Sequence, residues 1–371
     1  MPVIVKPLLP EQGEEALSFI QPYESECVNL ASELLRGGTN CWALYYADQE
    51  ASQTSGTENE SKPAILDCRI SRNITALPFC EKKLSTCSLK RAGNRARDQA
   101  RANSGSDLQG QKFAGLFCLK KKRSLFHCLP FAKYKSAFDK KVCSEAQRPL
   151  MEFFESNEPF CVNGEAAGSI FLRNILKNKK SPMLPSVTNK YFLMTRDCDQ
   201  NCSQDQNGGA ENEKASQNLN AGGGSGFAKD LRVVQATAAD YESLLPLELG
   251  YQREEVVPKS FDISDAALAA AFKHELGQGQ TFALYDGDRP IAKARIAASG
   301  RRYCMIGGVY TIPSERKKGR AAFLVSQIIK RSQAHGINNF SLYAKQENAA
   351  ALALYKSLGF TPRGEYLLVY Y

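Results

Sequence analysis

The residues best suited to chemistry lie in the stretch YTIPSERKKGRAAFLVSQIIKR, residues 310–331. A strand pattern ends at Thr311, and an apolar helical pattern begins near Arg320. The first backbone N–H groups of such a helix have no partner inside it, and the helix dipole is positive there. Gly319 lets a ligand approach the backbone closely, and Ala321 leaves room beside it. The junction therefore predicts an anion site suited to a pyrophosphate.

Four basic side chains surround this glycine, namely Arg316, Lys317, Lys318 and Arg320. Taken alone, the cluster equally fits a solvated loop with a basic helix start, and its charge also fits a nucleic-acid patch. The downstream stretch LYAKQENAAALALYKSLGF favours a ligand loop. In it Asn348 opens a second helix, Tyr355 lies near the end of that helix, and a terminal Gly-Phe follows.

The spacing Arg316-x-x-Gly319-x-Ala321 resembles the R/Q-x-x-G-x-G/A acyl-CoA loop of the GNAT superfamily of N-acetyltransferases. The downstream stretch looks like the second half of the same signature, and the resemblance covers residues 231–371. It implies an acyltransferase that uses acetyl-CoA as co-substrate and acetylates an amine acceptor, a small molecule or a protein amine, without a metal.

The resemblance also implies roles for single residues. The strand before the loop would diverge from its neighbour and pair with the pantetheine arm through the backbone of Gly308, Val309, Tyr310 and Thr311, with one N–H polarising the thioester carbonyl. The backbone amides of residues 316–321 would hold the pyrophosphate.

Proton transfer would fall to a second group of residues. The resemblance implies that Tyr355 protonates the departing CoA thiolate and that Asn348 contacts the cofactor or an ordered water. The simpler interpretations are a core tyrosine and a helix N-cap. Glu254, Glu255 or a water would accept the amine's proton, and the two carboxylates also fit surface positions.

Residues 231–371 show the order β-α-α-β-β-β-α-β-α-β, which predicts a GNAT-like mixed α/β (α+β) fold with a mostly antiparallel sheet flanked by helices. Thr237 with Asp240, and Ser264, mark two helix starts. The polar, glycine-rich segment 198–230 predicts a flexible linker. We expect residues 1–197 to form a second α/β domain, either a degenerate GNAT-like lobe without a cofactor loop or an unrelated fold.

Charge is concentrated in the first half. Glu81 to Lys141 holds 16 lysines and arginines against 4 acidic residues, in a chain of net charge +9. A solvated basic loop explains this excess, and nucleic acid binding through residues 82–141 is the alternative. The 12 cysteines show no metal-ligand spacing, and no signal peptide or membrane span is evident, so we expect a cytoplasmic protein with reduced thiols.

Two classes of function follow. The first is an acetyl-CoA-dependent N-acetyltransferase that works by direct attack in a ternary complex. The second is a non-catalytic acyl-CoA sensor or RNA-binding module on the same scaffold. The sequence identifies neither the acceptor nor the oligomeric state.

Overall fold

The computed structural model describes residues 2–38, 40–47, 111–120, 123–197 and 231–371. The predicted linker, residues 198–230, and residues 82–110 of the basic segment lie outside the described residues. Within the described parts, no helix is long and apolar enough to cross a membrane.

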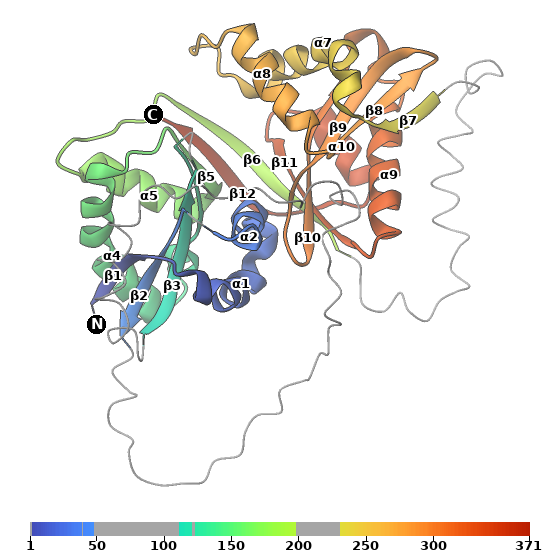
Figure 1. Ribbon diagram of the computed structural model, residues 1–371. Helices are drawn as coiled ribbons and strands as arrows, with labels where there is room; N and C mark the ends of the chain where they lie inside the picture. Colours follow the sequence, from blue (N-terminus) through green and yellow to red (C-terminus); the bar gives the residue numbers. More distant parts are fainter. Residues whose placement is uncertain (1, 39, 48–110, 121–122, 198–230) are drawn as a thin grey trace, which may run out of the picture.

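One sheet runs through both halves of the chain (Figure 1). Among the described residues it has twelve strands, in the order β1-β2-β3-β4-β5-β12-β6-β11-β10-β9-β8-β7. Neighbouring strands are antiparallel except for the pairs β4–β5 and β10–β11, so the predicted mixed, mostly antiparallel fold is confirmed. The strands of the first half are β1 (Val3–Pro7), β2 (Cys41–Ala47), β3 (Gln111–Leu119), β4 (Ser124–Cys128), β5 (Cys161–Glu165) and β6 (Val187–Arg196). Those of the second half are β7 (Leu231–Gln235), β8 (Thr281–Asp286), β9 (Arg289–Ser299), β10 (Tyr303–Thr311), β11 (Asn339–Lys345) and β12 (Thr361–Tyr370).

Helices cover both faces of the sheet. The helices of the first half are α1 (Gly13–Ile20), α2 (Val28–Leu35), α4 (Ala137–Ser156) and α5 (Ala166–Asn178). Those of the second half are α7 (Tyr241–Tyr251), α8 (Asp265–Leu276), α9 (Arg320–Gln333) and α10 (Ala349–Ser357). Five 3₁₀ segments, η1 (Pro10–Gln12), η2 (Gln21–Glu26), η5 (Pro130–Lys133), η7 (Ala238–Asp240) and η9 (Pro313–Glu315), and the π-helical turn η8 (Gln252–Val256) complete the described helical elements. The predicted caps are present: Thr237 and Asp240 form a capping box, and the Ser264 hydroxyl accepts the N–H of Ala267.

Among the described residues, the two halves follow the same order of strands and helices, β-α-α-β-β-β-α-β-α-β, and their last strands are exchanged. β6 lies between β11 and β12, and β12 lies between β5 and β6 (Figure 1). The linker at residues 198–230 therefore does not mark where the sheet divides, and the domain boundaries stay a prediction.

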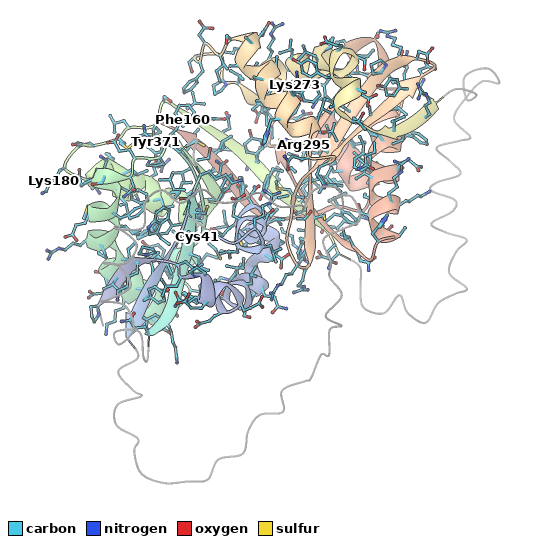
Figure 2. All side chains as sticks on the ribbon, in the orientation of Figure 1. Cys41, Phe160, Lys180, Lys273, Arg295 and Tyr371 are labelled. Carbon is cyan, nitrogen blue, oxygen red and sulfur yellow. The ribbon has the colours of Figure 1, made fainter. Side chains whose placement is uncertain are left out.

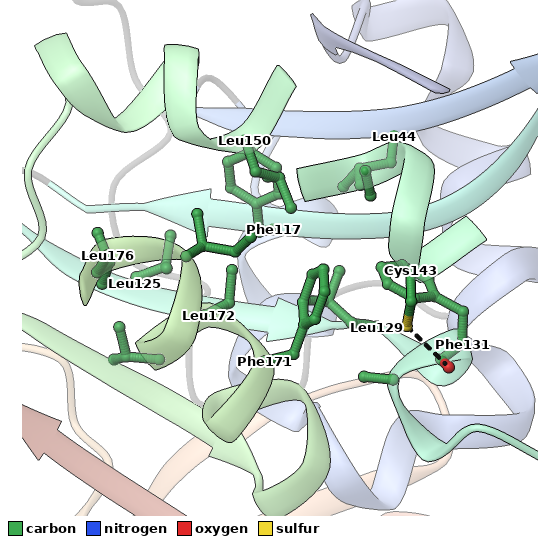
Figure 3. Packing of buried hydrophobic residues seen from close by; sticks show 14 of the residues in the cluster. Leu44, Phe117, Leu125, Leu129, Phe131, Cys143, Leu150, Phe171, Leu172 and Leu176 are labelled. Carbon is green, nitrogen blue, oxygen red and sulfur yellow. Dashed lines mark hydrogen bonds between the residues drawn. The ribbon is translucent and has the colours of Figure 1, made fainter. Parts of the chain in front are cut away.

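Strand residues alternate between the two helical layers, as the pleat of a strand requires. In β2, Trp42, Leu44 and Tyr46 face the cluster under α4 and α5, while Cys41, Ala43 and Tyr45 face the cluster under α1 and α2. Figure 3 shows the first of these clusters, where the Cys143 thiol reaches the carbonyl of Phe131 at 3.5 Å. In the second half, one cluster lies under α9 and α10 and another under α7 and α8.

Glu24, in η2, joins the first half to the second. Its carboxylate accepts the backbone N–H groups of Arg302 at 2.7 Å and Tyr303 at 3.0 Å, and the residue is only 2% exposed. The turn before β10 approaches so closely that a Cβ on Gly300 would lie 2.2 Å from the Glu24 Oε1 atom. This contact fixes the start of β10 against the first half.

We predict that Glu24→Ala lowers the free energy of unfolding by about 2 kcal/mol, because two backbone N–H groups lose a buried, charged acceptor. Denaturant unfolding measures the change. Glu14→Ala is the control, since Glu14 pairs with Arg301 at the surface of the same junction and its loss changes the free energy by about 0.5 kcal/mol or less. Equal losses in the two variants would contradict the prediction.

Candidate functional site

The parallel strands β10 and β11 separate after a short contact. Their ladder pairs Tyr303–Met305 with Asn339–Ser341 and ends there, although β10 continues to Thr311 and β11 to Lys345. The two strands therefore do not pair along their second halves, which agrees with the divergence that the family resemblance implies for residues 308–311.

A β-bulge interrupts β10 at the same level. Gly307 pairs with Arg295 and Tyr310 with Lys293, so three steps along β10 match two along β9. Gly308 takes up the extra residue with φ +60, a conformation that favours glycine, and a Cβ there would lie 3.3 Å from the Arg295 side chain. The bulge turns the peptide between Gly308 and Val309 out of the regular ladder.

The loop after β10 ends in an open helix start. Gly319 is the N-cap of α9 with φ +72, and no side chain caps this end of the helix. The N–H groups of Arg320 and Ala321 are thus first-turn donors, which have no acceptor inside the helix. A Cβ on Gly319 would meet nothing within 4 Å, so the glycine is required by its backbone conformation rather than by packing within the chain. The geometry fits the predicted anion site.

Most of the basic side chains in this loop have carboxylate partners. Glu315 accepts the Lys318 ammonium at 3.0 Å and the Arg320 guanidinium at 3.3 Å, and these two contacts lower the pKa of its carboxyl. Arg316 donates to Glu254 at 2.7 Å and to the carbonyl of Thr311 at 3.0 Å. Lys317 is exposed, with φ +61. An anion at this loop would therefore be held mainly by backbone N–H groups.

Glu254 also ties the loop to the diverging strand. Its second oxygen accepts the Tyr310 hydroxyl at 2.8 Å, and the Arg316 guanidinium lies over the Tyr310 ring at 5.3 Å. The hydroxyl fits because residue 250 is glycine: a Cβ there would lie 2.5 Å from it. Glu254 thus holds β10 and the loop at residues 316–319 together.

Glu255 lies instead beside Asn348 and near Tyr355. It contacts the Asn348 side-chain amide at 3.5 Å and the Lys345 ammonium at 3.3 Å. Burial raises the pKa of Tyr355, and the neighbouring Tyr251 and Glu255 raise it further. Asn348 caps α10 by accepting the N–H of Ala351 at 3.0 Å, so the helix-cap interpretation is correct and leaves its amide free to face Glu255.

A group of buried charges, not predicted from the sequence, lies under the bulge. Lys293 is 1% exposed, and its ammonium lies 2.6 Å from Glu248, 3.2 Å from the carbonyl of Gly308 and 4.4 Å from the centre of the Tyr251 ring. Beside it, Arg295 (labelled in Figure 2) pairs with Glu275, whose pKa is raised by burial. The signal was present in IAKARIAAS, where a central strand carries two cations.

The corresponding region of the first half is closed. β4 and β5 pair in parallel only from Ser124–Phe126 to Cys161–Asn163, and the buried His127 fills the space beyond. A Cβ on Gly164 would lie 2.0 Å from the His127 ring, which bonds to the Ser169 hydroxyl at 2.9 Å. The start of α4 is already capped by Ser136 and Asp139, which places a carboxylate where an anion would bind.

The pKa of His127 is lowered to about 3 by burial. The unfolded chain takes up a proton below about pH 6.5, whereas folded His127 stays neutral, so stability falls as the pH drops from about 6.5 towards 3. We predict that, because of His127, the free energy of unfolding of the wild type falls by about 3 kcal/mol between pH 7 and pH 4, and that His127→Gln lacks this fall. Denaturant unfolding at the two pH values measures it. The control is His274→Gln at an exposed position, which should keep the pH dependence of the wild type. If His127→Gln also keeps the wild-type pH dependence of the free energy of unfolding, the lowered pKa of His127 is wrong.

Comparison with known proteins identifies the class of this fold. Residues 243–360 match the family model described as acetyltransferase (GNAT) family. The matched region contains the bulge, the loop, Asn348 and Tyr355. A search of curated proteins found no match.

Several solved structures are similar to the chain. A Drosophila melanogaster protein aligns over 99% of this chain and 98% of its own, with 11% identity and a TM-score of 0.50. A GNAT-family acetyltransferase from Colwellia psychrerythraea aligns over 70% of this chain and 81% of its own, with 12% identity and a TM-score of 0.40. The ribosomal-protein-S18-alanine N-acetyltransferase of Escherichia coli aligns over 38% of this chain and 91% of its own, with 20% identity and a TM-score of 0.30.

Proposed function

We propose that this protein is an acetyl-CoA-dependent N-acetyltransferase that acetylates a primary amine by direct attack while both substrates are bound. The observation that carries the proposal is the uncapped helix start at Gly319, placed at the end of a strand that diverges from its parallel neighbour. The family match of residues 243–360 supports the same class of reaction. Acetyl-CoA, when bound, supplies the activated acetyl group.

Each part of the site has a task in this proposal. The backbone of residues 309–311 pairs with the pantetheine arm, and the amides of residues 316–321 hold the pyrophosphate. Arg316 and Lys317 add positive charge at the rim. Binding both substrates in one geometry supplies much of the rate enhancement.

Proton transfer is assigned to Glu255 and Tyr355. Glu255 takes the proton of the attacking amine, directly or through a water, because it lies beside Asn348 and Tyr355, whereas Glu254 is occupied by Tyr310 and Arg316. Tyr355 gives its proton to the CoA thiolate as the carbon–sulfur bond breaks. The phenol is protonated at neutral pH, as an ordinary tyrosine is, so the proton is available.

Binding of acetyl-CoA tests the function directly. We predict that wild-type protein binds acetyl-CoA in calorimetry and that Gly319→Glu weakens binding roughly 100-fold, because the new carboxylate meets the pyrophosphate. Gly336→Glu is a matched control: Gly336 also has positive φ and open space, but lies beyond the far end of α9. Failure of the wild type to bind, or undiminished binding by Gly319→Glu, would refute the cofactor site.

A second prediction concerns proton transfer. With an amine found by screening a library for CoA release, Tyr355→Phe should lower turnover by about 10²- to 10⁴-fold while acetyl-CoA affinity is unchanged. Glu255→Gln should act in the same way, whereas Glu254→Gln, which weakens the contacts of Tyr310 and Arg316, should raise the KM for acetyl-CoA more than it lowers kcat. If Glu254→Gln is inactive and Glu255→Gln is active, the base is Glu254. Binding without turnover for every amine would favour the acyl-CoA sensor instead.

Nucleic acid binding has less support. In the described part of the basic segment, Lys120 pairs with Glu33, Arg123 with Glu158 and Lys133 with Glu26. The acceptor, the role of the first half and the cytoplasmic location stay predictions.

A further inference from the structure

The buried pair Lys293–Glu248 needs an explanation beyond stability. Both side chains are almost fully buried, at 2% and 4% exposure, so each charge has lost its hydration. Replacing such a pair by apolar residues is often neutral for stability or even favourable, so a buried ion pair alone is weak support for a role in folding. The contacts of the ammonium indicate what else it does.

The Lys293 ammonium has three donors and three neighbours. One is the Glu248 carboxylate at 2.6 Å, one is the carbonyl of Gly308 at 3.2 Å, and one is the face of the Tyr251 ring at 4.4 Å. Gln252 donates to the other oxygen of Glu248 at 2.6 Å and so holds the carboxylate in turn. The lysine is held by Glu248 and Tyr251 of α7 and by the bulge of β10, and Gln252 of η8 holds its carboxylate partner.

The hydrogen bond to Gly308 orients one particular peptide group. The structure has no cis peptide bond among its described residues, so the carbonyl of Gly308 and the N–H of Val309 point in opposite directions. Lys293 belongs to β9, which borders β10 on the side away from β11. The Lys293 ammonium lies with Glu248 and Tyr251 of α7, so with the carbonyl held towards it the N–H of Val309 is held pointing away from α7.

We propose that Lys293 and Glu248 are positioning residues of the acetyl-transfer site: they hold the carbonyl of Gly308 and thereby aim the N–H of Val309 at the thioester carbonyl. This inference rests on the proposed function. A backbone donor stabilises the developing negative charge on the thioester oxygen only if it is preorganised, and a bulge glycine is the residue least able to hold its own orientation. The buried cation supplies the missing constraint.

The matched variant for a test is Lys293→Met/Glu248→Gln. Lys293→Met alone leaves Glu248 buried without its cation, and misfolding would confuse the result. The double variant removes both charges, keeps an oxygen for Gln252 and loses the donor to Gly308. The control is Arg253→Met/Asp265→Asn, which removes an exposed ion pair from the same half of the chain.

The sequence offers a specific probe of this peptide. Gly308–Val309 is the only Gly–Val step in the chain, so labelling with carbonyl-¹³C glycine and ¹⁵N valine gives a single carbonyl–amide NMR correlation. In the free protein, the Gly308 carbonyl signal should move upfield in the double variant and stay unchanged in the control. On addition of acetyl-CoA, the Val309 amide proton of the wild type should move downfield, more than with CoA, which lacks the acetyl group.

The expected result is that the double variant binds acetyl-CoA with unchanged affinity and loses this downfield shift. An unchanged Gly308 carbonyl signal in the double variant, or a retained Val309 shift, would overturn the positioning role. Absence of acetyl-CoA binding by the wild type would refute the proposed function and the catalytic part of the inference. The Gly308 carbonyl signal of the free protein would still decide whether Lys293 holds the bulge, so the two failures are distinguishable.

Discussion

The exchange of the last strands constrains the rest of this molecule. β12 follows directly from α10, which carries Tyr355, and it pairs on one edge with β5 and on the other with β6. β6 in turn pairs with β11 over six positions, from Phe340–Arg196 to Lys345–Tyr191. A chain of residues 231–371 alone would lack β6 and would leave β11 with an open edge. The first half is therefore part of the sheet on which the site is built.

The charged residues of the candidate site form two groups, one at the surface and one buried below β10. At the surface, Glu315 and Glu254 neutralise most of the basic loop, so the loop is not a simple patch of free positive charge. Screening by salt weakens exposed pairs of this kind. Below the strand, Lys293 and Glu248 are shielded from water, and their interaction is correspondingly strong. The surface group organises the loop, and the buried group acts on one peptide of β10.

The sequence predicted the parts of the site that depend on local rules. The glycine at the strand-to-helix junction, the Asn348 cap and the capping box at Thr237 all follow from backbone requirements within a few residues. The contacts between Lys293 and Glu248, and between Glu24 and the turn at Arg302, join residues far apart in the chain. Nothing in one local segment specifies such a partner, so these contacts could not be derived from spacing. The two candidate bases, Glu254 and Glu255, are neighbours in the sequence and differ in their long-range contacts. Glu254 bonds to Arg316, and Glu255 bonds to Asn348.

The repeated architecture shows that topology alone does not create a binding site. Both halves place a helix after a strand that parts early from its parallel neighbour, yet only the second leaves the helix start uncapped. In the first half, Asp139 lies at the equivalent helix start, and the ring of His127 occupies the space that Gly164 and Gly168 leave open. A carboxylate and an imidazole thus satisfy the groups that a ligand would otherwise contact. The two halves therefore use the same backbone geometry differently. In the first half, side chains of the protein cap the helix start, and in the second half no side chain caps it.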